Sequence, residues 1–503
     1  MDLEKRMKRE SIRIIVSEII MVVTVAIMVV ILAFLVSGYW LGSGFTVERQ
    51  GMLQISSIPT GASVAVDGDS PWFQRTNTSK VLASGEHEII LTKDGYDSWS
   101  KTVNIREGLL YRLHYPRLFL QNRELETVGT YATATFGTVS PNRKWLILAN
   151  NTMSWTLINL DRDQLTPTEL DVSGLLGDAG TSATSVFSGE ITYTDWAGDN
   201  EHLLLSVKSG DTTDWILLNI RNVSDSVNIT KEISTGLSNP EFYDNSASIM
   251  LAIRGGDLYR LDISSRKLSA PLAKSVSQYS IYDGEIIFVS ELTDLASMST
   301  DNASNSDTDT GSIDAEASAS EITEITDSVA DSSTAKYAVN LLRFGDTAPT
   351  KIDSATTAPR AYISKFYDDK YIILVKDATI SVHQKDTYEE VYSGSLGFTP
   401  TNIKIGHDGE FVFMADGTNF ATLDMESYTL TEWTAGTEHY GWIDSDMLYA
   451  VSGGELNVYD YDSLNRRTLS SNVSDHFPVT ITANKWLYYF SDDHLVREWL
   501  IKR

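Results

Sequence analysis

One stretch of the chain has the ligand spacing of a calcium-binding loop. In the segment NSDTDTGSIDAE, Asn305, Asp307 and Asp309 alternate and Glu316 stands at the twelfth position. Such a loop requires glycine at the sixth position for its sharp turn, but Gly311 is the seventh residue here. Because partial matches arise easily in an acidic low-complexity tract, we expect no metal site, and calcium binding stays open.

Residue types that carry out covalent or hydrolytic chemistry form no known motif. The absence of cysteine excludes disulfides, thiolate catalysis and cysteine-type zinc sites. There is no Gly-x-Ser-x-Gly elbow, and adjacent carboxylates such as Asp492 and Asp493 are typical of turns. The eight histidines are scattered and form no His-x-x-x-His or His-Glu-x-x-His pair: His87, His114, His202, His383, His407, His439, His476 and His494. We therefore expect no catalytic, cofactor or metal site.

The composition indicates an acidic, folded protein with several domains. The chain has 503 residues, of which 42% are hydrophobic and 10% aromatic, and its formal net charge is −28. This length exceeds one ordinary hydrophobic core, so two or three domains are expected. Nucleic acid is not expected as a partner, because a phosphate backbone requires a basic surface.

Residues 19–41 have the composition of a membrane-spanning helix. The run IIMVVTVAIMVVILAFLV (Ile19–Val36) contains no charge, proline or glycine, and Tyr39, Trp40 and Leu41 extend it to about the 20 residues that a bilayer requires. Basic residues predominate before this run, so the positive-inside rule puts residues 1–18 in the cytoplasm and everything after residue 41 outside. We expect a single-pass cell-membrane protein held in the lipid bilayer by residues 19–41.

A cleaved signal peptide is the alternative for this segment. Signal peptides have a shorter apolar core followed by a cleavage site of small residues. The apolar run is long here, and no such site follows it. The sequence therefore favours a retained anchor and a linker over residues 42–50, with the acidic bulk of the chain outside the cell.

Residues 51–118 alternate between apolar and polar positions, as in a small β-sandwich or open barrel. Ser63 to Val66 alternates directly into Asp67-Gly68, which is a strong signal for a β-hairpin. Further strands follow, separated by glycine-containing turns. About 65 residues with five or six strands make a small all-β module.

This region resembles the PEGA domain, a small β module of many bacterial and archaeal surface proteins. Thr60 stands where the name-giving motif has glutamate, and Asp69–Ser79 replaces a short Gly-x-Thr-Pro turn. The resemblance implies a structural stalk, since the family has no agreed catalytic role. Three segments carry it in order: IPTGASVAVDG (Ile58–Gly68), LASGEHEIIL (Leu82–Leu91) and KDGYDSW (Lys93–Trp99).

The motif residues of this module are expected to shape its backbone rather than to bind a ligand. Proline, glycine and aspartate favour turns, and the tyrosine packs on the sheet. In the unusual loop that follows, exposed aromatic side chains would anchor a partner or a sugar, and Trp72 and Phe73 are the candidate contact residues. The structural residues are Pro59, Gly61, Ala62, Asp67, Gly68, Gly85, Gly95 and Tyr96.

A repeated unit fills residues 119–503. Each copy has a polar turn, a short apolar run and a second short strand, and most copies are about 40 residues apart. This period, with about four short strands per unit, is typical of a β-propeller, here of seven or eight blades. The last copy has room for three strands, so a strand from residues 118–130 should complete it and close the ring. The central strands start near Leu146, Leu203, Ile249, Ile286, Tyr371, Phe411, Met447 and Trp486.

Two turns of the repeat resemble those of TolB-like and WD-repeat-like propellers. They are SPNRKW (Ser140–Trp145) and HDGEFVF (His407–Phe413). The resemblance implies the fold but no function, because propellers host binding, scaffolding and catalysis alike.

An acidic insert over residues 294–335 interrupts the fourth copy. Between Lys274 and Lys336 there is no lysine or arginine, while 13 acidic residues occur. Such a segment buries too little apolar surface to become ordered. We expect a disordered loop between two strands of the fourth blade.

The sequence thus predicts a mainly β surface protein of bacterial type, with a transmembrane helix, a PEGA-like sandwich and an extracytoplasmic propeller. We expect a non-catalytic binding or scaffold function at the cell envelope, with a protein or polysaccharide partner. Two alternatives stay open. One is a hydrolase or lyase that acts on envelope polysaccharide or peptide from the propeller channel, and the other is an accessory subunit of an envelope membrane complex.

Overall fold

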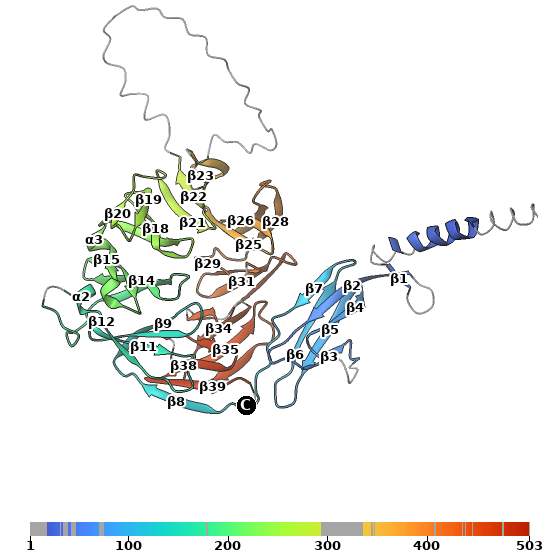
Figure 1. Cartoon of the computed structure of the whole chain (residues 1–503), viewed down its shortest axis with the longest axis horizontal. Helices are drawn as coiled ribbons and strands as arrows, with labels where there is room; N and C mark the ends of the chain where they lie inside the picture. The colour runs from blue at the N-terminus through green and yellow to red at the C-terminus, as the bar shows by residue number, and fades with distance from the viewer. Residues whose placement is uncertain are drawn as a thin grey trace, which may run out of the picture.

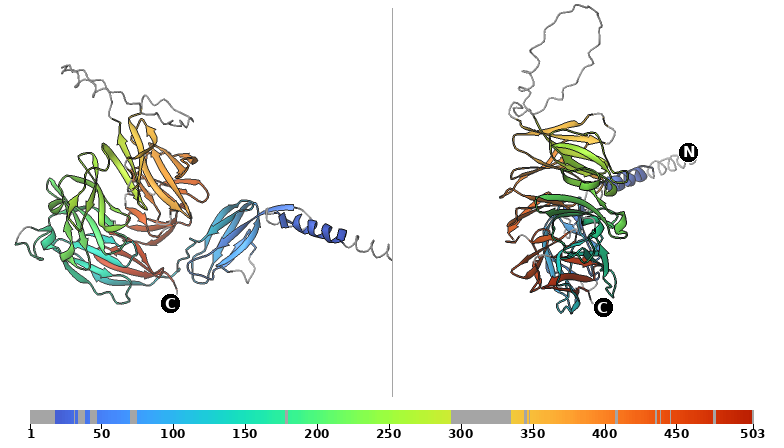
Figure 2. Two further views of the ribbon diagram at one scale, coloured as in Figure 1. Left: turned by 45° about the horizontal axis from the view of Figure 1, so that its top comes forward. Right: turned by 90° about the vertical axis from the view of Figure 1, so that its left-hand side faces the viewer.

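The computed structural model is mainly β and consists of a small sandwich and a large ring of sheets, preceded by a helix (Figure 1). In Figures 1 and 2 the sandwich, drawn in blue, lies between the helix and the ring. The structure describes residues 18–30, 32–33, 39–41, 47–69, 75–177, 180–292, 335–343, 346, 348–406, 409–434, 436–437, 439–444, 446–474 and 477–501.

The N-terminal helix comprises residues 18–30 and 32–33. Among the described residues, no helix combines the length and the hydrophobicity that a bilayer crossing requires. The prediction that the helix continues to residue 41 is wrong, because Tyr39–Leu41 forms strand β1, antiparallel to β2 (Val47–Ile55). Aromatic side chains favour strands, and β2 supplies the backbone partners for this one. The predicted linker over residues 42–50 is also too long, since β2 begins at Val47.

Residues 47–118 form the N-terminal sandwich, whose two sheets share one hydrophobic core. Alternate side chains point inwards, so that Leu53, Ile55, Val64, Ile89 and Leu91 are completely buried. One sheet contains β1, β2, β4 (Thr78–Ala83) and β7 (Leu110–Leu113), and the other contains β3 (Ser63–Val66), β5 (Gly85–Thr92) and β6 (Trp99–Ile105).

The predicted hairpin at Asp67-Gly68 is confirmed. Val66 and Asp69 exchange two backbone hydrogen bonds of 2.9 Å across it. Both central residues have positive φ, 52° for Asp67 and 80° for Gly68. This is the backbone conformation of a two-residue hairpin turn, which favours the Asp-Gly sequence.

The ring contains eight four-stranded antiparallel sheets, which are the blades of a β-propeller. Blade 1 consists of β9 (Ala134–Val139), β10 (Trp145–Asn150), β11 (Ser154–Asn159) and β12 (Thr168–Asp171), and blade 2 consists of β13 (Glu190–Trp196), β14 (His202–Ser209), β15 (Thr212–Asn219) and β16 (Val227–Asn228). Blade 3 consists of β17 (Leu237–Tyr243), β18 (Ser246–Arg254), β19 (Asp257–Asp262) and β20 (Lys267–Leu268), and blade 4 consists of β21 (Val276–Tyr282), β22 (Glu285–Glu291), β23 (Tyr337–Arg343) and β24 (Thr350–Ala355).

Blades 5 to 8 complete the ring. Blade 5 consists of β25 (Arg360–Phe366), β26 (Asp369–Lys376), β27 (Thr379–Gln384) and β28 (Glu390–Ser395), and blade 6 consists of β29 (Asn402–Ile405), β30 (Phe411–Ala415), β31 (Asn419–Asp424) and β32 (Thr429–Thr434). Blade 7 consists of β33 (Tyr440–Trp442), β34 (Met447–Ser452), β35 (Glu455–Asp460) and β36 (Arg467–Ser470), and blade 8 consists of β37 (Thr480–Thr482), β38 (Trp486–Ser491), β39 (His494–Trp499) and β8 (Leu125–Thr130). Short helices α2 (Ser173–Leu176), η1 (Val223–Asp225) and α3 (Ile229–Glu232) lie in and between blades 1 to 3.

Successive residues of each central strand face opposite neighbouring blades, which explains the continuous apolar runs in the sequence. For example, Leu203 belongs to the core between blades 1 and 2, and Leu204 to the core between blades 2 and 3. One core lies between every pair of adjacent blades, including blades 8 and 1, so the ring is closed. Residue pairs that share a core are Trp155 and Leu203, Leu204 and Met250, Leu251 and Ile286, Ile287 and Ile372, Ile373 and Val412, Phe413 and Leu448, Tyr449 and Leu487, and Tyr488 and Leu146.

The predicted ring closure is confirmed. Strand β8, from the N-terminal side of the propeller, pairs antiparallel with β39 and becomes the fourth strand of blade 8. Arg497 of β39 reinforces this pairing by donating two hydrogen bonds to the Glu126 carboxylate, at 2.9 and 3.0 Å. The eight predicted central strands correspond to the second strands of the eight blades.

The acidic insert joins the second and third strands of blade 4. Strands β22 and β23 pair with each other on either side of it, so its predicted place in the fold is correct. The predicted disorder concerns residues that lie, apart from residue 335, outside the described part of the chain.

Candidate functional site

The N-terminal sandwich packs against one face of the propeller. Strands alternate in direction, so the turns between the first and second strands and between the third and fourth strands of each blade lie on the same face. We call this the junction face. Trp99, Lys101 and Arg112 of the sandwich contact such turns or the strand ends beside them. The connection between β22 and β23 that contains the acidic insert lies on the opposite face.

Aromatic side chains make the core of the sandwich continuous with the propeller. Tyr115 lies edge-on to Tyr461 of blade 7, with ring centroids 5.2 Å apart, and to Phe411 of blade 6, at 6.3 Å. Phe411 and Tyr461 stack at 3.9 Å. Both propeller residues belong to the hydrophobic core of the sandwich. Each such pair contributes about 0.5–1.5 kcal/mol beyond area burial, so the sandwich and blades 6 and 7 share one core.

A buried hydrogen bond links Trp99 to blade 7. The indole Nε1 of Trp99 donates to Oδ2 of Asp460 at 2.7 Å, and the Asn465 side chain donates to the same oxygen at 2.8 Å. Burial, and next the neighbouring Asp462, raise the pKa of Asp460 to about 7. Asn465 also exchanges hydrogen bonds with the backbone of Ser100, and thus imitates a neighbouring strand.

Lys101 lies at the centre of the junction. Its ammonium group forms an ion pair with Asp462 at 2.6 Å and donates to the hydroxyls of Tyr115 and Tyr461 at 2.7 and 2.8 Å. The Lys101 and Asp462 side chains are 8% and 9% exposed. Burial raises the pKa of both tyrosines well above the ordinary value, so the phenols stay neutral.

Arg117, in the segment that leaves the sandwich, connects three blades. Its Nη2 donates to Asp444 of blade 7 at 2.6 Å and to Asn484 of blade 8 at 2.8 Å, and Asp444 also accepts from Arg143 of blade 1. The Arg117 side chain is 3% exposed, and its Nε and Nη1 have no hydrogen-bond partner among the described residues. Burial, followed by the Asp444 charge, raises the pKa of Asp446 to about 7.

Carboxylates gather on the blade 6 side of the junction. Burial, and next the neighbouring Glu410 and Asp424 charges, raise the pKa of Glu426 to about 7. Two side chains in and beside β7 partly offset this accumulation of negative charge. Arg112 lies 3.6 Å from Glu426, and Nε2 of His114 lies 3.1 Å from Glu410.

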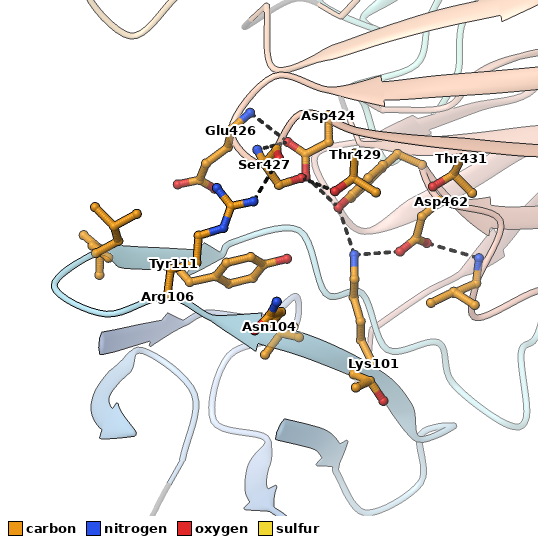
Figure 3. Close-up of a pocket in the computed structure, with 16 residues that line it drawn as sticks. Lys101, Asn104, Arg106, Tyr111, Asp424, Glu426, Ser427, Thr429, Thr431 and Asp462 are labelled. Atoms are coloured by element: carbon orange, nitrogen blue, oxygen red, sulfur yellow. Dashed lines mark hydrogen bonds and ion pairs between the residues drawn. The ribbon is translucent and has the colours of Figure 1, made fainter. Parts of the chain in front are cut away.

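A cavity of ≈ 420 Å³ lies between the sandwich and the propeller (Figure 3). Strands β6 and β7 form one wall, and the turns that follow β31 and β35 form the other. The sandwich contributes Lys101, Asn104, Arg106 and Tyr111, and the propeller contributes Asp424, Glu426, Thr431 and Asp462. The volume falls within the roughly 300–1,000 Å³ of small-molecule pockets.

A second group of ionisable residues lies on innermost strands around the propeller axis. Asp195 belongs to blade 2, Glu241 to blade 3 and Lys404 to blade 6, which is opposite blade 2. Burial, and to a smaller degree Asp195, raise the pKa of Glu241 to about 8. Burial lowers the pKa of Lys404, and Asp195 opposes this shift from across the ring.

The motif residues predicted from the sequence shape the sandwich and are not among the residues that line the cavity. Gly61, Gly68, Gly85 and Gly95 have positive φ. The backbone N–H groups of Gly61 and Ala62 donate to Thr76 Oγ1, Pro59 follows a cis peptide bond, Asp67 binds His87 at 2.7 Å, and Tyr96 is buried in the core.

The candidate contact residues Trp72 and Phe73 and the calcium-like stretch from Asn305 lie outside the described residues. Within the described part of the chain, no group of three acidic or histidine side chains could hold a metal ion. Sequence reasoning included Trp99 only in a segment that resembles the PEGA domain, and it did not identify Lys101 or Tyr111. Tyr461 lies 360 residues from Lys101 and Asp460 lies 361 residues from Trp99, and no local pattern indicates such contacts.

Solved structures of low sequence identity are similar to the larger part of this chain. No curated protein matches the chain. The C-terminal WD40 domain of Sif2 is 10% identical, with a TM-score of 0.44 over 75% of this chain and 99% of that one. Hsv2p of Kluyveromyces lactis is 9% identical, with a TM-score of 0.38 over 65% of this chain and 92% of that one. An oligogalacturonate lyase in complex with manganese is 10% identical, with a TM-score of 0.40 over 75% and 99%.

The N-terminal sandwich also matches a family model. The matched family is described as the PEGA domain, and the match covers residues 50–117. These bounds coincide with the sandwich from β2 to the start of the connection to the propeller. Residues 50–117 are therefore a PEGA domain, packed against the β-propeller that follows it.

Proposed function

We propose that the protein is a membrane-anchored, extracytoplasmic binding or scaffold protein of the cell envelope. The PEGA domain holds the propeller in a fixed orientation, and the face opposite the junction face receives a protein or polysaccharide partner. The observation that carries this proposal is the junction itself. A shared aromatic core and the buried Lys101–Asp462 pair make the two domains one unit, as presentation of a binding surface requires.

The anchoring part of the proposal is supported by the sequence of residues 19–41. Eighteen residues from Ile19 to Val36 carry no charge, and basic residues precede them. The described helix leads away from the side of the PEGA domain that faces the propeller (Figure 2). In this arrangement the PEGA domain separates the bilayer from the propeller.

Two measurements test the proposal. Protease treatment of intact cells should degrade the propeller, whereas protection of the propeller would refute the extracytoplasmic assignment. The full chain, kept in detergent, should be retained on isolated envelope material. The absence of retention would refute the proposed binding function but would not contradict the description of the fold.

Catalysis in the propeller channel is the second candidate. The axial group of Asp195, Glu241 and Lys404 favours it, because a carboxyl group with a pKa of about 8 and an amine with a lowered pKa are suited to proton transfer at neutral pH. The reaction would be hydrolysis or elimination on envelope polysaccharide or peptide. Glu241→Gln should abolish turnover of digested envelope material, and equal turnover by the variant would exclude this site.

A further inference from the structure

The two walls of the junction cavity differ in their hydrogen-bonding character (Figure 3). The PEGA wall presents the Arg106 guanidinium and the Tyr111 hydroxyl as donors, whereas the three N–H groups of Lys101 are already bonded to Asp462, Tyr115 and Tyr461. The propeller wall presents acceptors, above all the Asp424 and Glu426 carboxylates. A ligand between these walls must accept hydrogen bonds on one side and donate them on the other.

The charged groups are held in place by contacts of their own. The Lys101 ammonium is paired with Asp462, and Asp424 accepts hydrogen bonds from the Ser427 and Tyr461 hydroxyls at 2.8 and 3.1 Å. Arg106 donates to the backbone oxygen of Ser427 at 3.3 Å. Because these side chains are fixed by the junction, the two walls cannot collapse onto each other, and the polar cavity between them persists.

Three neutral groups of the cavity have no side-chain hydrogen bond to another described residue. They are the Tyr111 hydroxyl, the Asn104 amide and the Thr431 hydroxyl. Groups of this kind are free to bind a ligand, and hydroxyl and amide groups match the hydroxyls of a neutral molecule. Tyr111 comes from β7, Thr431 comes from β32, and Asn104 comes from β6, so they approach from both domains.

The charge balance excludes strongly charged ligands. A phosphate would lie beside Asp424, Glu426 and Asp462, and the burial of Asp424 and Asp462 makes the repulsion costly. An ammonium ion would instead meet Lys101 and Arg106. A neutral molecule with many hydroxyl groups avoids both costs and satisfies both walls.

Apolar surface completes the lining of the cavity. Leu109 and Leu464 are 56% and 45% exposed at its edge, and the Tyr111 ring lies along the PEGA wall. Sugar rings combine hydroxyl edges with apolar C–H faces, and aromatic and aliphatic side chains cover such faces. We propose that the junction cavity, built jointly by the PEGA domain and blades 6 and 7, is a binding site for a neutral saccharide of one or two rings.

Ligand-observed NMR and calorimetry on the full chain test this inference, which deepens the proposed binding function. The probes are glucose, N-acetylglucosamine, cellobiose and N,N′-diacetylchitobiose, with glucose 6-phosphate as the charged comparison. At least one neutral probe should bind, and glucose 6-phosphate should bind more weakly than glucose. No neutral binding up to about 10 mM, a weak limit for specific recognition, or tighter binding of the phosphate, overturns the proposal.

Variants locate the binding. Tyr111→Phe removes one hydroxyl and should weaken binding about tenfold, and Asn104→Ala should weaken it by a similar factor. Tyr388→Phe is the matched control, because Tyr388 is 40% exposed and is not among the residues that line the cavity. If the neutral saccharide binds Tyr111→Phe and Asn104→Ala as tightly as it binds the control, the proposed location of the site is wrong. Retention on envelope material, measured with the same Asn104→Ala protein, shows separately whether the opposite face still binds its partner.

Discussion

The indole nitrogen of Trp99 donates a 2.7 Å hydrogen bond to the carboxylate of Asp460, and the two residues are 361 positions apart in the chain. The bond is buried and connects strand β6 of the PEGA domain with strand β35 of blade 7. A stalk that merely held the propeller at a distance would not require it. The PEGA domain is therefore joined to the propeller by specific buried contacts.

Trp99→Phe should lower the free energy of unfolding by about 1–3 kcal/mol, because it leaves a buried carboxylate with one donor fewer. Urea unfolding followed by circular dichroism measures the change. Trp155→Phe is the matched control, since Trp155 is equally buried but its Nε1 has no hydrogen-bond partner among the described residues. Equal losses in both variants would show that only ring volume matters at position 99.

Stability should fall as the pH rises towards neutrality. The pKa of Asp460 is raised from 3.8 to about 7 in the folded state, so the folded protein binds this proton more tightly than the unfolded chain does. The resulting stabilisation is complete below the unfolded pKa and is lost as the pH rises through the folded one. Asp446 and Glu426, whose pKa values are also about 7, change in the same direction.

Asp460→Asn isolates one of these groups. The amide oxygen can still accept from Trp99, while the titration disappears. The decline of the melting temperature between pH 5 and pH 8 should therefore be smaller in Asp460→Asn than in the wild type. A profile that is unchanged by the substitution would assign the pH dependence to other groups.

Gly51→Ala should destabilise the PEGA domain. A Cβ at Gly51 would meet the backbone oxygen of Arg106 and lie 2.6 Å from Ile105 Cγ2, which is closer than real contacts allow. Overpacking of this kind costs about 1–3 kcal/mol. Gly174→Ala is the control, because a Cβ there meets nothing within 4 Å. Thermal unfolding measures the difference between the two variants, and equal melting temperatures would contradict the tight packing of β2 against the end of β6 and the turn that follows it.

Arg497→Met should weaken the closure of the ring. The Arg497 side chain is 7% exposed and donates to both oxygens of Glu126 in β8. Hydrogen bonds to charged groups contribute about 1.5–3 kcal/mol, so a loss of this size is expected in urea unfolding. Arg162→Met, at an exposed position of blade 1, should change little. A variant as stable as this control would show that the β8–β39 backbone pairing suffices for closure.

The sequence predicted features that depend on local pattern. Asp67-Gly68 specifies its hairpin through backbone conformation alone, and the apolar runs at Leu203 and Met447 mark central strands because both of their faces are buried. The strand that closes the ring followed from the three-stranded last copy. Tyr39–Leu41 was assigned wrongly, since hydrophobicity does not distinguish the end of a helix from a short strand that pairs with β2.

The junction could not be predicted in the same way. Lys101 occupies an ordinary position in a strand, and its partners Asp462 and Tyr461 occupy an ordinary turn of blade 7. Nothing in either local sequence specifies the other. Their meeting depends on the register of eight blades and on the connection through Arg117, which are properties of the complete fold.

The central claim is that the PEGA domain and the propeller form one rigid unit. The chain contains no cysteine, so spin labels can be placed uniquely by Glu86→Cys in the PEGA domain and Asp211→Cys in blade 2, both at exposed positions. Pulsed electron–electron double resonance on the doubly labelled full chain measures the distribution of distances between the two spin labels. A single narrow distribution that broadens in Trp99→Ala is the predicted result. A broad distribution in the otherwise unchanged protein would contradict the account.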